Sequence, residues 1–273
     1  SGTAADITAA LTGISGYAGA VTASDAQTGS DGVTAVKALG AATAGVVTAT
    51  LSGTAAELAL LNTAGTDMIA VTLSNAHTLA QLKDINNATG GAITLNDASV
   101  LLSGTAADIT AALAGISGYT GTVTASGTQT GSAGVTALNA LGTATAGVLT
   151  ATASGTAAEL ALLTTAGTDL IAVTLSNAHD LAQLKAINNA TGGTITLNDA
   201  SVALSGTAAD ITAALTGISS YTGAVTLTTD HTLPELKAIN NASNGTINLN
   251  NAGVALSGTM ADITAALTGI SGY

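Results

Sequence analysis

Apolar residues recur along this chain with a spacing that alternates between that of a helix and that of a strand. In the opening stretch SGTAADITAALTGI, Ile7, Leu11 and Ile14 stand at i, i+4 and i+7, so they share one face of a helix. In AITL (92–95), two apolar residues flank a threonine, which places them on the same side of a strand. Short helices and short strands are therefore expected to follow one another.

Four such helix–strand units make up the first hundred residues. The helical parts are TAADITAALTGI from Thr3, GVTAVKALGAAT from Gly32, TAAELALLNTAG from Thr54 and TLAQLKDINNAT from Thr78, and a β-branched run follows each of them. Equivalent residues lie roughly 22–29 apart, a spacing typical of solenoids. Helices of two to three turns are too short to persist alone in water, so packing against the strands must hold them.

The units are grouped into larger repeats. The opening fourteen residues return at Ser103 with one change, at Ser205 unchanged and at Ser257 with Met260 in place of alanine. We interpret 1–102 and 103–204 as two four-coil blocks and 205–273 as a shortened third block, all of one continuous solenoid.

This pattern predicts an α/β fold. A strand–helix–strand step of this length implies parallel strands with right-handed crossovers. We expect a right-handed parallel solenoid with one short strand and one short helix per coil, about eleven coils in all. Both termini cut through a repeat, so uncapped ends are expected, and exposed solenoid ends favour joining end to end.

Threonine marks the start of most helices. A threonine before the helix with an acid three residues later has the pattern of a capping box, in which the acid accepts from the N-cap backbone N–H. The expected pairs are Thr3/Asp6, Thr54/Glu57, Thr105/Asp108, Thr156/Glu159, Thr207/Asp210 and Thr259/Asp262.

A second set of threonines is expected on the outer face of the sheet. One threonine per strand points away from the apolar side chains, so these residues should stack in a ladder about 4.8 Å apart. The expected ladder is Thr22, Thr48, Thr72, Thr94, Thr124, Thr150, Thr174, Thr196 and Thr226.

Composition restricts the class of protein. The chain of 273 residues has no Phe, Trp or Cys and one Pro, so its core must be a thin one of small aliphatic side chains. A net charge of −12, from 16 acids against 4 lysines, disfavours nucleic acid and anionic lipid as partners. The uncharged stretch 109–158 is broken by many glycines, so no membrane insertion is expected.

Three phrases carry a resemblance to a known class of proteins. LSGTAADITAALTGI (204–218), LAQLKAINNAT (181–191) and GTITLNDASVALSG (193–206) resemble the repeat region of giant bacterial cell-surface and secreted proteins, the haemolysin-type and adhesin-like repeat proteins. VTLSNAHTLAQLKDI (71–85) more loosely resembles a leucine-rich repeat. The first resemblance implies export, surface attachment and an adhesive or filamentous role, and it supplies no catalytic residue.

Few residues are candidates for metal binding. Asp97 and Asp199 follow strands and could place carboxylates at a stacked edge that suits calcium. Calcium is nevertheless not favoured, because TGGTITLND (191–199) lacks the second G-x-D step of a calcium-binding nonapeptide. His77, His179 and His231 stand before helix starts without a second histidine nearby, and we expect them to be solvent-exposed turn residues rather than ligands. No cofactor is expected.

No catalytic motif stands out. GISGY (13–17) has the pattern G-x-S-G rather than the G-x-S-x-G of a nucleophile elbow, and no Gly-Lys pair forms a phosphate loop. We therefore expect no enzyme and no catalytic or cofactor-binding residue.

Together these features predict a structural segment of an extracellular bacterial surface fibre, filament or adhesin stalk, located outside the cell or at its surface. The expected partner is the protein itself, end to end or side by side, with surface glycans as a second expected partner. The alternative function is a binding module that uses the threonine ladder to recognise a glycan or ice.

Overall fold

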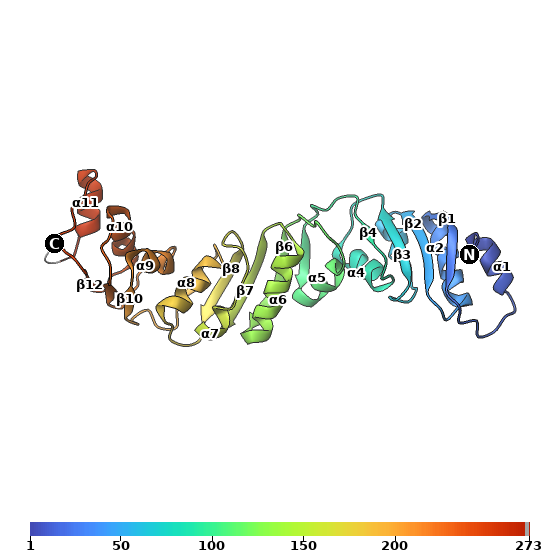
Figure 1. Ribbon diagram of the computed structural model, residues 1–273, viewed down its shortest axis with the longest axis horizontal. Helices are drawn as coiled ribbons and strands as arrows, with labels where there is room; N and C mark the ends of the chain where they lie inside the picture. The colour runs from blue at the N-terminus through green and yellow to red at the C-terminus, as the bar shows by residue number, and fades with distance from the viewer. Residues whose placement is uncertain (271–272) are drawn as a thin grey trace. The chain divides into compact units, whose positions relative to one another are not determined.

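The computed structural model describes residues 1–270 and 273, and the chain divides into two compact units. The first unit comprises Ser1–Ser126 and Thr143–Val148, and the second comprises Gly127–Gly142 and Leu149–Tyr273. Strands and helices alternate along both units, and β1, β2 and β3 of the first unit lie side by side (Figure 1).

The elements of the first unit are α1 (Ala4–Leu11), β1 (Val21–Thr28), α2 (Gly29–Ala42), β2 (Val47–Gly53), α3 (Ala55–Leu58), β3 (Met68–Leu73), α4 (Leu79–Asn87), β4 (Ile93–Thr94), β5 (Leu102–Thr105) and α5 (Ala106–Leu113). Two elements have residues in both units, β6 (Val123–Thr130) and α6 (Gly131–Ala144). Those of the second unit are β7 (Leu149–Gly155), α7 (Ala157–Leu160), β8 (Leu170–Leu175), α8 (Leu181–Asn189), β9 (Ile195–Thr196), β10 (Leu204–Gly206), α9 (Ala208–Leu215), β11 (Val225–Leu227), α10 (Leu233–Ala242), β12 (Ile247–Asn248) and α11 (Met260–Leu267).

Neighbouring strands within each unit are parallel. The first unit has the order β1-β2-β3-β4 and a separate pair of β5 with β6, and the second has β7-β8-β9 and β10-β11-β12. The expected α/β class with parallel sheets and alternating strands and helices is thus confirmed. The sheet is interrupted between β4 and β5 and again between β9 and β10, which the repeat pattern did not indicate.

The core consists of small aliphatic residues that alternate along the strands. In β3, Ile69, Val71 and Leu73 are buried, and the residues between them are exposed. Val36 and Leu39 of α2 are fully buried against this layer. The side chains thus form the thin core of small aliphatic residues that the composition predicts.

The α3 segment is shorter than the expected helix over TAAELALLNTAG. After Leu58 the backbone tightens into i→i+3 bonds, from Leu60 N to the Glu57 carbonyl and from Leu61 N to the Leu58 carbonyl. This tightening turns Leu61 into the core and leaves Leu60 65% exposed.

A buried hydroxyl and a glycine form the corner after five helices, α2, α4, α6, α8 and α10. Thr89, after α4, accepts a bond from Ile69 N at 3.0 Å and donates to backbone carbonyls of the preceding coil, and Gly91 N donates to its hydroxyl at 2.9 Å. A Cβ on Gly91 would lie 2.3 Å from the Ile69 oxygen. The same Thr/Ser-x-Gly corner occurs at Thr43–Gly45, Thr145–Gly147, Thr191–Gly193 and Ser243–Gly245.

Candidate functional site: the repeated junction

The chemistry-bearing side chains of this protein gather where the sheet is interrupted. A donor segment (77–87, 179–189 or 231–241) carries a histidine, a lysine and an asparagine, and it packs against the next copy of the opening motif. We call these copies acceptor motifs (1–17, 103–119, 205–221 and 257–273), and a donor segment on an acceptor motif a junction. Within residues 1–270 and 273 there are three junctions, one in the first unit and two in the second.

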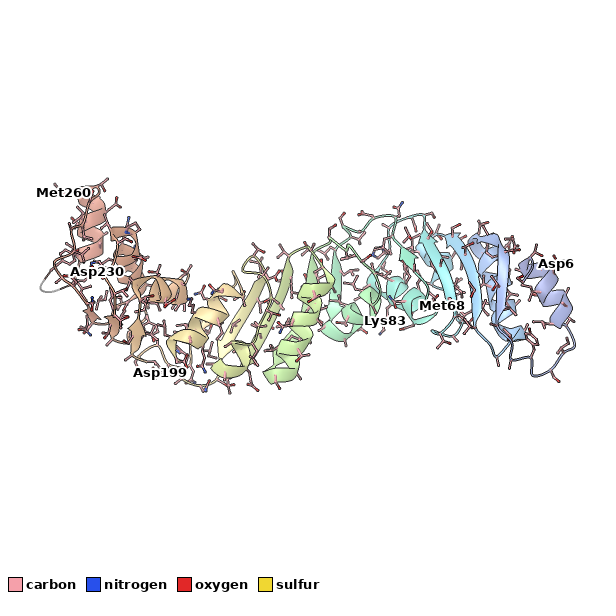
Figure 2. All side chains as sticks on the ribbon, viewed as in Figure 1. Asp6, Met68, Lys83, Asp199, Asp230 and Met260 are labelled. Atoms are coloured by element: carbon pink, nitrogen blue, oxygen red, sulfur yellow. The ribbon has the colours of Figure 1, made fainter. Side chains whose placement is uncertain are left out.

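An ion pair joins the two helices of each junction. Lys83 of α4 pairs with Asp108 of α5, and Lys185 pairs with Asp210 in the same way. The third pair, Lys237–Asp262, has an Nζ–Oδ1 distance of 2.5 Å. Lys83 projects from α4 in Figure 2. The hydrogen bond to Asp108 raises the pKa of Lys83, and the same bond lowers the pKa of Asp108.

An asparagine caps the end of each acceptor helix from outside. The Asn188 amide donates to the carbonyls of Ala214 at 3.0 Å and Thr216 at 2.6 Å, at the end of α9. Asn240 donates to the carbonyls of Thr268, the equivalent of Thr216, at 2.9 Å and of Ala265, one residue before the equivalent of Ala214, at 2.8 Å. These carbonyls belong to the last helical turn, which has no intrahelical donors for them. The donor segment therefore recognises the helix end as well as its carboxylate.

A histidine and a tyrosine pack inside each junction. His179 Nε2 lies 3.1 Å from the Tyr221 hydroxyl, which donates to the Val202 carbonyl at 2.5 Å. Since that hydroxyl proton is used, His179 Nε2 carries the proton and donates to the tyrosine. Tyr221 is fully buried, and burial raises its pKa to about 12. The two side chains of this pair come from residues 42 apart in the sequence.

The histidines correct the expectation of solvent-exposed turn residues. His77, His179 and His231 are 4%, 4% and 3% exposed, because a tyrosine of the following acceptor motif closes over each ring. Within the described residues, both ring nitrogens of His77 and the Nδ1 atoms of the other two are buried without a hydrogen-bond partner. Only the regular spacing of histidine and tyrosine in the sequence could have indicated this pairing.

The two candidate metal ligands serve as turn formers. Asp97 Oδ1 accepts from Ser99 N at 2.8 Å and from the Ser99 hydroxyl at 2.6 Å, and these two bonds lower the pKa of Asp97. Asp199 makes the same bonds to Ser201. Among the residues that the structure describes, no group of three or more His, Asp or Glu side chains could hold a metal ion.

The helix caps fall into two kinds. Thr54 and Glu57 form a complete capping box, as do Thr156 and Glu159. At the other four sites the threonine hydroxyl accepts from the backbone of the aspartate, as in Thr3 and Asp6 at 3.1 Å, but no carboxylate bond to the N-cap N–H is formed. This corrects the expected capping box at Thr3/Asp6, Thr105/Asp108, Thr207/Asp210 and Thr259/Asp262. Aspartate is one methylene shorter than glutamate, and three of the four bind the junction lysine instead.

The expected threonine ladder is divided into shorter columns. Strand register pairs Thr22 with Thr48, but the next neighbour is Met68, which is 50% exposed. In the second unit Thr150 pairs with Leu170. One column of four hydroxyls, Thr28–Ser52–Thr72–Thr94, joins β1 to β4, with Thr28 and Ser52 in place of the expected Thr22 and Thr48. The other expected members lie opposite serine, threonine or asparagine, in Ser103–Thr124, Ser154–Thr174–Thr196 and Ser205–Thr226–Asn248.

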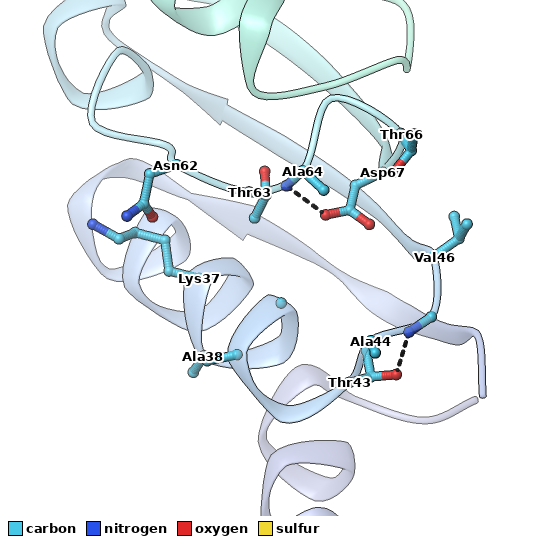
Figure 3. Close-up of a pocket in the computed structure, with 13 residues that line it drawn as sticks. Lys37, Ala38, Thr43, Ala44, Val46, Asn62, Thr63, Ala64, Thr66 and Asp67 are labelled. Atoms are coloured by element: carbon cyan, nitrogen blue, oxygen red, sulfur yellow. Dashed lines mark hydrogen bonds between the residues drawn. The ribbon is translucent and has the colours of Figure 1, made fainter. Parts of the chain in front are cut away.

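A surface hollow of about 610 Å³ lies beside α2, lined by Lys37, Thr43, Asn62 and Asp67 among others (Figure 3). Asp67 is its one buried charged group, but both of its carboxylate oxygens are used. Oδ1 accepts from Val47 N at 2.8 Å and Oδ2 accepts from Ala64 N at 3.1 Å. Both carboxylate oxygens of its acid are therefore used within the fold, and Asp67 is a structural residue that the sequence analysis missed.

Stability is expected to fall as the pH drops below 6.5, the ordinary pKa of histidine. Burial lowers the pKa of His77, His179 and His231, so the unfolded chain binds protons in a range where the folded chain does not. At pH values below the folded-state pKa, each unit by which burial lowers a histidine pKa reduces the free energy of unfolding by about 1.4 kcal/mol. The acids that oppose this effect are Asp97 at His77, Asp180 and Asp199 at His179, and Asp230 and Glu235 at His231.

Urea unfolding followed by tyrosine fluorescence at a series of pH values between 7.5 and 5.5 measures this loss, because the ordinary pKa values of Asp and Glu, 3.8 and 4.5, lie at least one unit below this range. A variant with His77, His179 and His231 all replaced by phenylalanine should lose the dependence, since the ring remains and the charge does not. Equal slopes in the two proteins would contradict burial of neutral histidines.

No protein-family model, no curated protein and no solved structure matches this chain. Among the described residues, no helix is both long and apolar enough to cross a membrane.

Proposed function

We propose that this chain is a structural repeat segment of an extracellular bacterial surface fibre, filament or adhesin stalk. In this proposal it forms a right-handed parallel solenoid of about eleven coils, each of roughly 22–29 residues with a short strand and a short helix. Its partner is the protein itself, and it carries no catalytic residue and no cofactor. The resemblance to repeats of giant bacterial surface proteins supports the location outside the cell.

The observation that carries the proposal is the threefold repetition of the junction. At each junction, the donor segment supplies a lysine, an asparagine and a histidine. These contact the aspartate, the helix end and the tyrosine of the acceptor motif, in that order. Side chains that could bind or transform a ligand are therefore used to join modules. A contact that is repeated between successive repeats suits an extended array, in which each repeat contacts only its neighbours.

Negative-stain electron microscopy of the concentrated chain tests the proposal. We expect linear assemblies whose length grows with protein concentration. Isolated compact particles at every concentration would contradict a fibre-forming role.

An alternative function is binding of a glycan or of ice by the exposed hydroxyls of the sheet. The column Thr28–Ser52–Thr72–Thr94 favours it, since parallel register holds these four residues in line. Thr94→Lys should then abolish binding to a glycan array or thermal hysteresis, with Thr34→Lys, on the exposed face of α2, as control. Absence of both signals in the unmodified chain would contradict this alternative.

A further inference from the structure

A three-residue sequence recurs at the end of each donor segment. NAT (87–89), NAT (189–191) and NAS (241–243) have the form Asn-x-Thr/Ser, the sequon at which N-linked saccharides are attached. The third copy has serine in place of threonine, and this change keeps the form. One further sequon, NGT (244–246), occurs in the chain.

The fold requires the hydroxyl of these sequons but not the asparagine. The Thr89 hydroxyl accepts from Ile69 N and Gly91 N at the corner after α4. The same corner is formed after α2 and α6 with Ala41 and Thr143 two residues before the hydroxyl. The corner therefore does not explain why asparagine stands at this place in all three donor segments.

The sequon asparagines are exposed and unbonded. Among residues 1–270 and 273, no hydrogen bond holds the side chain of Asn87, Asn189 or Asn241, and all three residues are exposed. None of them has the left-handed conformation that favours asparagine at a helix end. The adjacent Asn86, in contrast, donates to carbonyls at the end of α5. The sequon asparagine is thus free to carry a group that the fold does not supply.

Two of these asparagines line hollows with polar walls. Asn189 lines a hollow of about 430 Å³ beside the ends of α8 and α9, and Asn241 lines one of about 510 Å³ beside the ends of α10 and α11. Asparagine, threonine and glycine form most of both walls, with Thr216 in the first and Thr268 in the second. Amide, hydroxyl and backbone groups can bond to the hydroxyls of a saccharide.

We infer that Asn87, Asn189 and Asn241 are N-glycosylation sites, each of which carries a saccharide on its side-chain nitrogen. This inference rests on the proposed function, because N-linked saccharides are typical of surface loops in secreted proteins. Asn244 is not included, since its equivalents in the other two donor segments are glycines, Gly90 and Gly192.

The transfer requires a glycosyltransferase and a sugar linked to a nucleotide or lipid through phosphate. The asparagine Nδ2 attacks C1 of that sugar, and a bond forms between the two atoms. The bond from C1 to the phosphate oxygen breaks, and its electron pair leaves with the phosphate. One amide proton passes to a base of the transferase.

The transfer precedes folding of the corner. Thr89, Thr191 and Ser243 are 4%, 4% and 5% exposed, so a transferase cannot reach their hydroxyls in the folded chain. Folding then buries the hydroxyl and leaves the asparagine, with its saccharide, at the surface. The same three residues thereby serve the transferase first and the fold afterwards.

Peptide mapping by mass spectrometry of the protein isolated from the cells that make it tests the inference. Trypsin cuts after lysine, so Asn87 lies in the peptide 84–185, Asn189 in 186–237, and Asn241 in the peptide that begins at Ala238. We expect each peptide to carry the mass of a saccharide. Electron-transfer fragmentation should locate this mass on the sequon asparagine.

Adjacent asparagines supply the matched variants. Asn87→Gln, made in the same cells, should remove the saccharide from the peptide 84–185 and leave it on the other two peptides. Asn86→Gln is the control, because it changes the neighbouring amide and keeps the sequon, and it should retain all three saccharides. Circular dichroism establishes that both variants are folded.

Three results would overturn the inference. They are peptides 84–185 and 186–237 that carry no saccharide, a saccharide located on serine, threonine or Asn244 instead of the three asparagines, and a saccharide that persists on the peptide 84–185 of Asn87→Gln. Unmodified peptides from a protein that forms linear assemblies would leave the proposed function in place. A glycosylated protein that forms only isolated compact particles would instead contradict the proposed function and leave this inference standing.

Discussion

Replacement of Gly91 by alanine is expected to destabilise the first unit by about 3 kcal/mol or more, because it forces a side-chain atom into backbone that cannot move. The new Cβ would lie 2.3 Å from the carbonyl oxygen of Ile69 and 2.5 Å from its carbon. These atoms belong to β3, and the adjacent bond from Val71 N to the Ala92 carbonyl, at 2.8 Å, holds β4 against it. Relief of the clash requires separation of the two strands.

Urea unfolding followed by circular dichroism measures this effect. Gly193→Ala, at the equivalent corner of the second unit, places its Cβ 2.3 Å from the Ile171 oxygen and should behave alike. Gly2→Ala is the matched control, since its Cβ meets nothing closer than 3.7 Å. A loss at Gly91 no larger than that at Gly2 would show that the coils are not packed as closely as described.

Replacement of Asp67 by alanine is expected to cost about 3 kcal/mol, since a carboxylate that accepts two backbone bonds is removed. Asp67 is 4% exposed, and the Val47 N–H that it satisfies lies at the buried start of β2. Without it, that buried N–H loses its acceptor.

The free energy of unfolding of Asp67→Asn should lie between those of Asp67→Ala and the unmodified protein, because one of the two accepting oxygens remains. Asp84→Ala, on the exposed face of α4, is the control and should change the free energy of unfolding little. Both are measured by the same urea titration. A small loss at Asp67 would indicate that the corner rearranges to satisfy Val47 by another route.

The junction explains why the opening motif recurs so closely. Ile109 and Leu113 of the second copy face the core, Asp108 faces a lysine, and Gly104 leaves room for a leucine. A change at any of these positions would disturb one neighbour, and the same neighbour is present at every junction. The opening motif therefore recurs because it forms the same contact each time, rather than because it forms a repeated active site.

The sequence by itself determined the local structure, since that depends on residues a few positions apart. The spacing of Ile7 and Leu11 locates α1, and the threonine before it locates the N-cap. The expected stripe is wrong at Ile14, because the helix ends at Leu11 and Ile14 is 54% exposed. The repeat length and the alternation of helix and strand were enough to predict parallel strands.

Only the tertiary structure decided which residues meet between coils. The burial of His179 depends on Tyr221, 42 residues away, and the ion pair of Asp108 depends on Lys83, 25 residues away. The register that sets Met68 beside Thr48 depends on how long each preceding helix and loop is. Contacts of this kind follow from the three-dimensional path of the chain, which spacing within a single repeat does not contain.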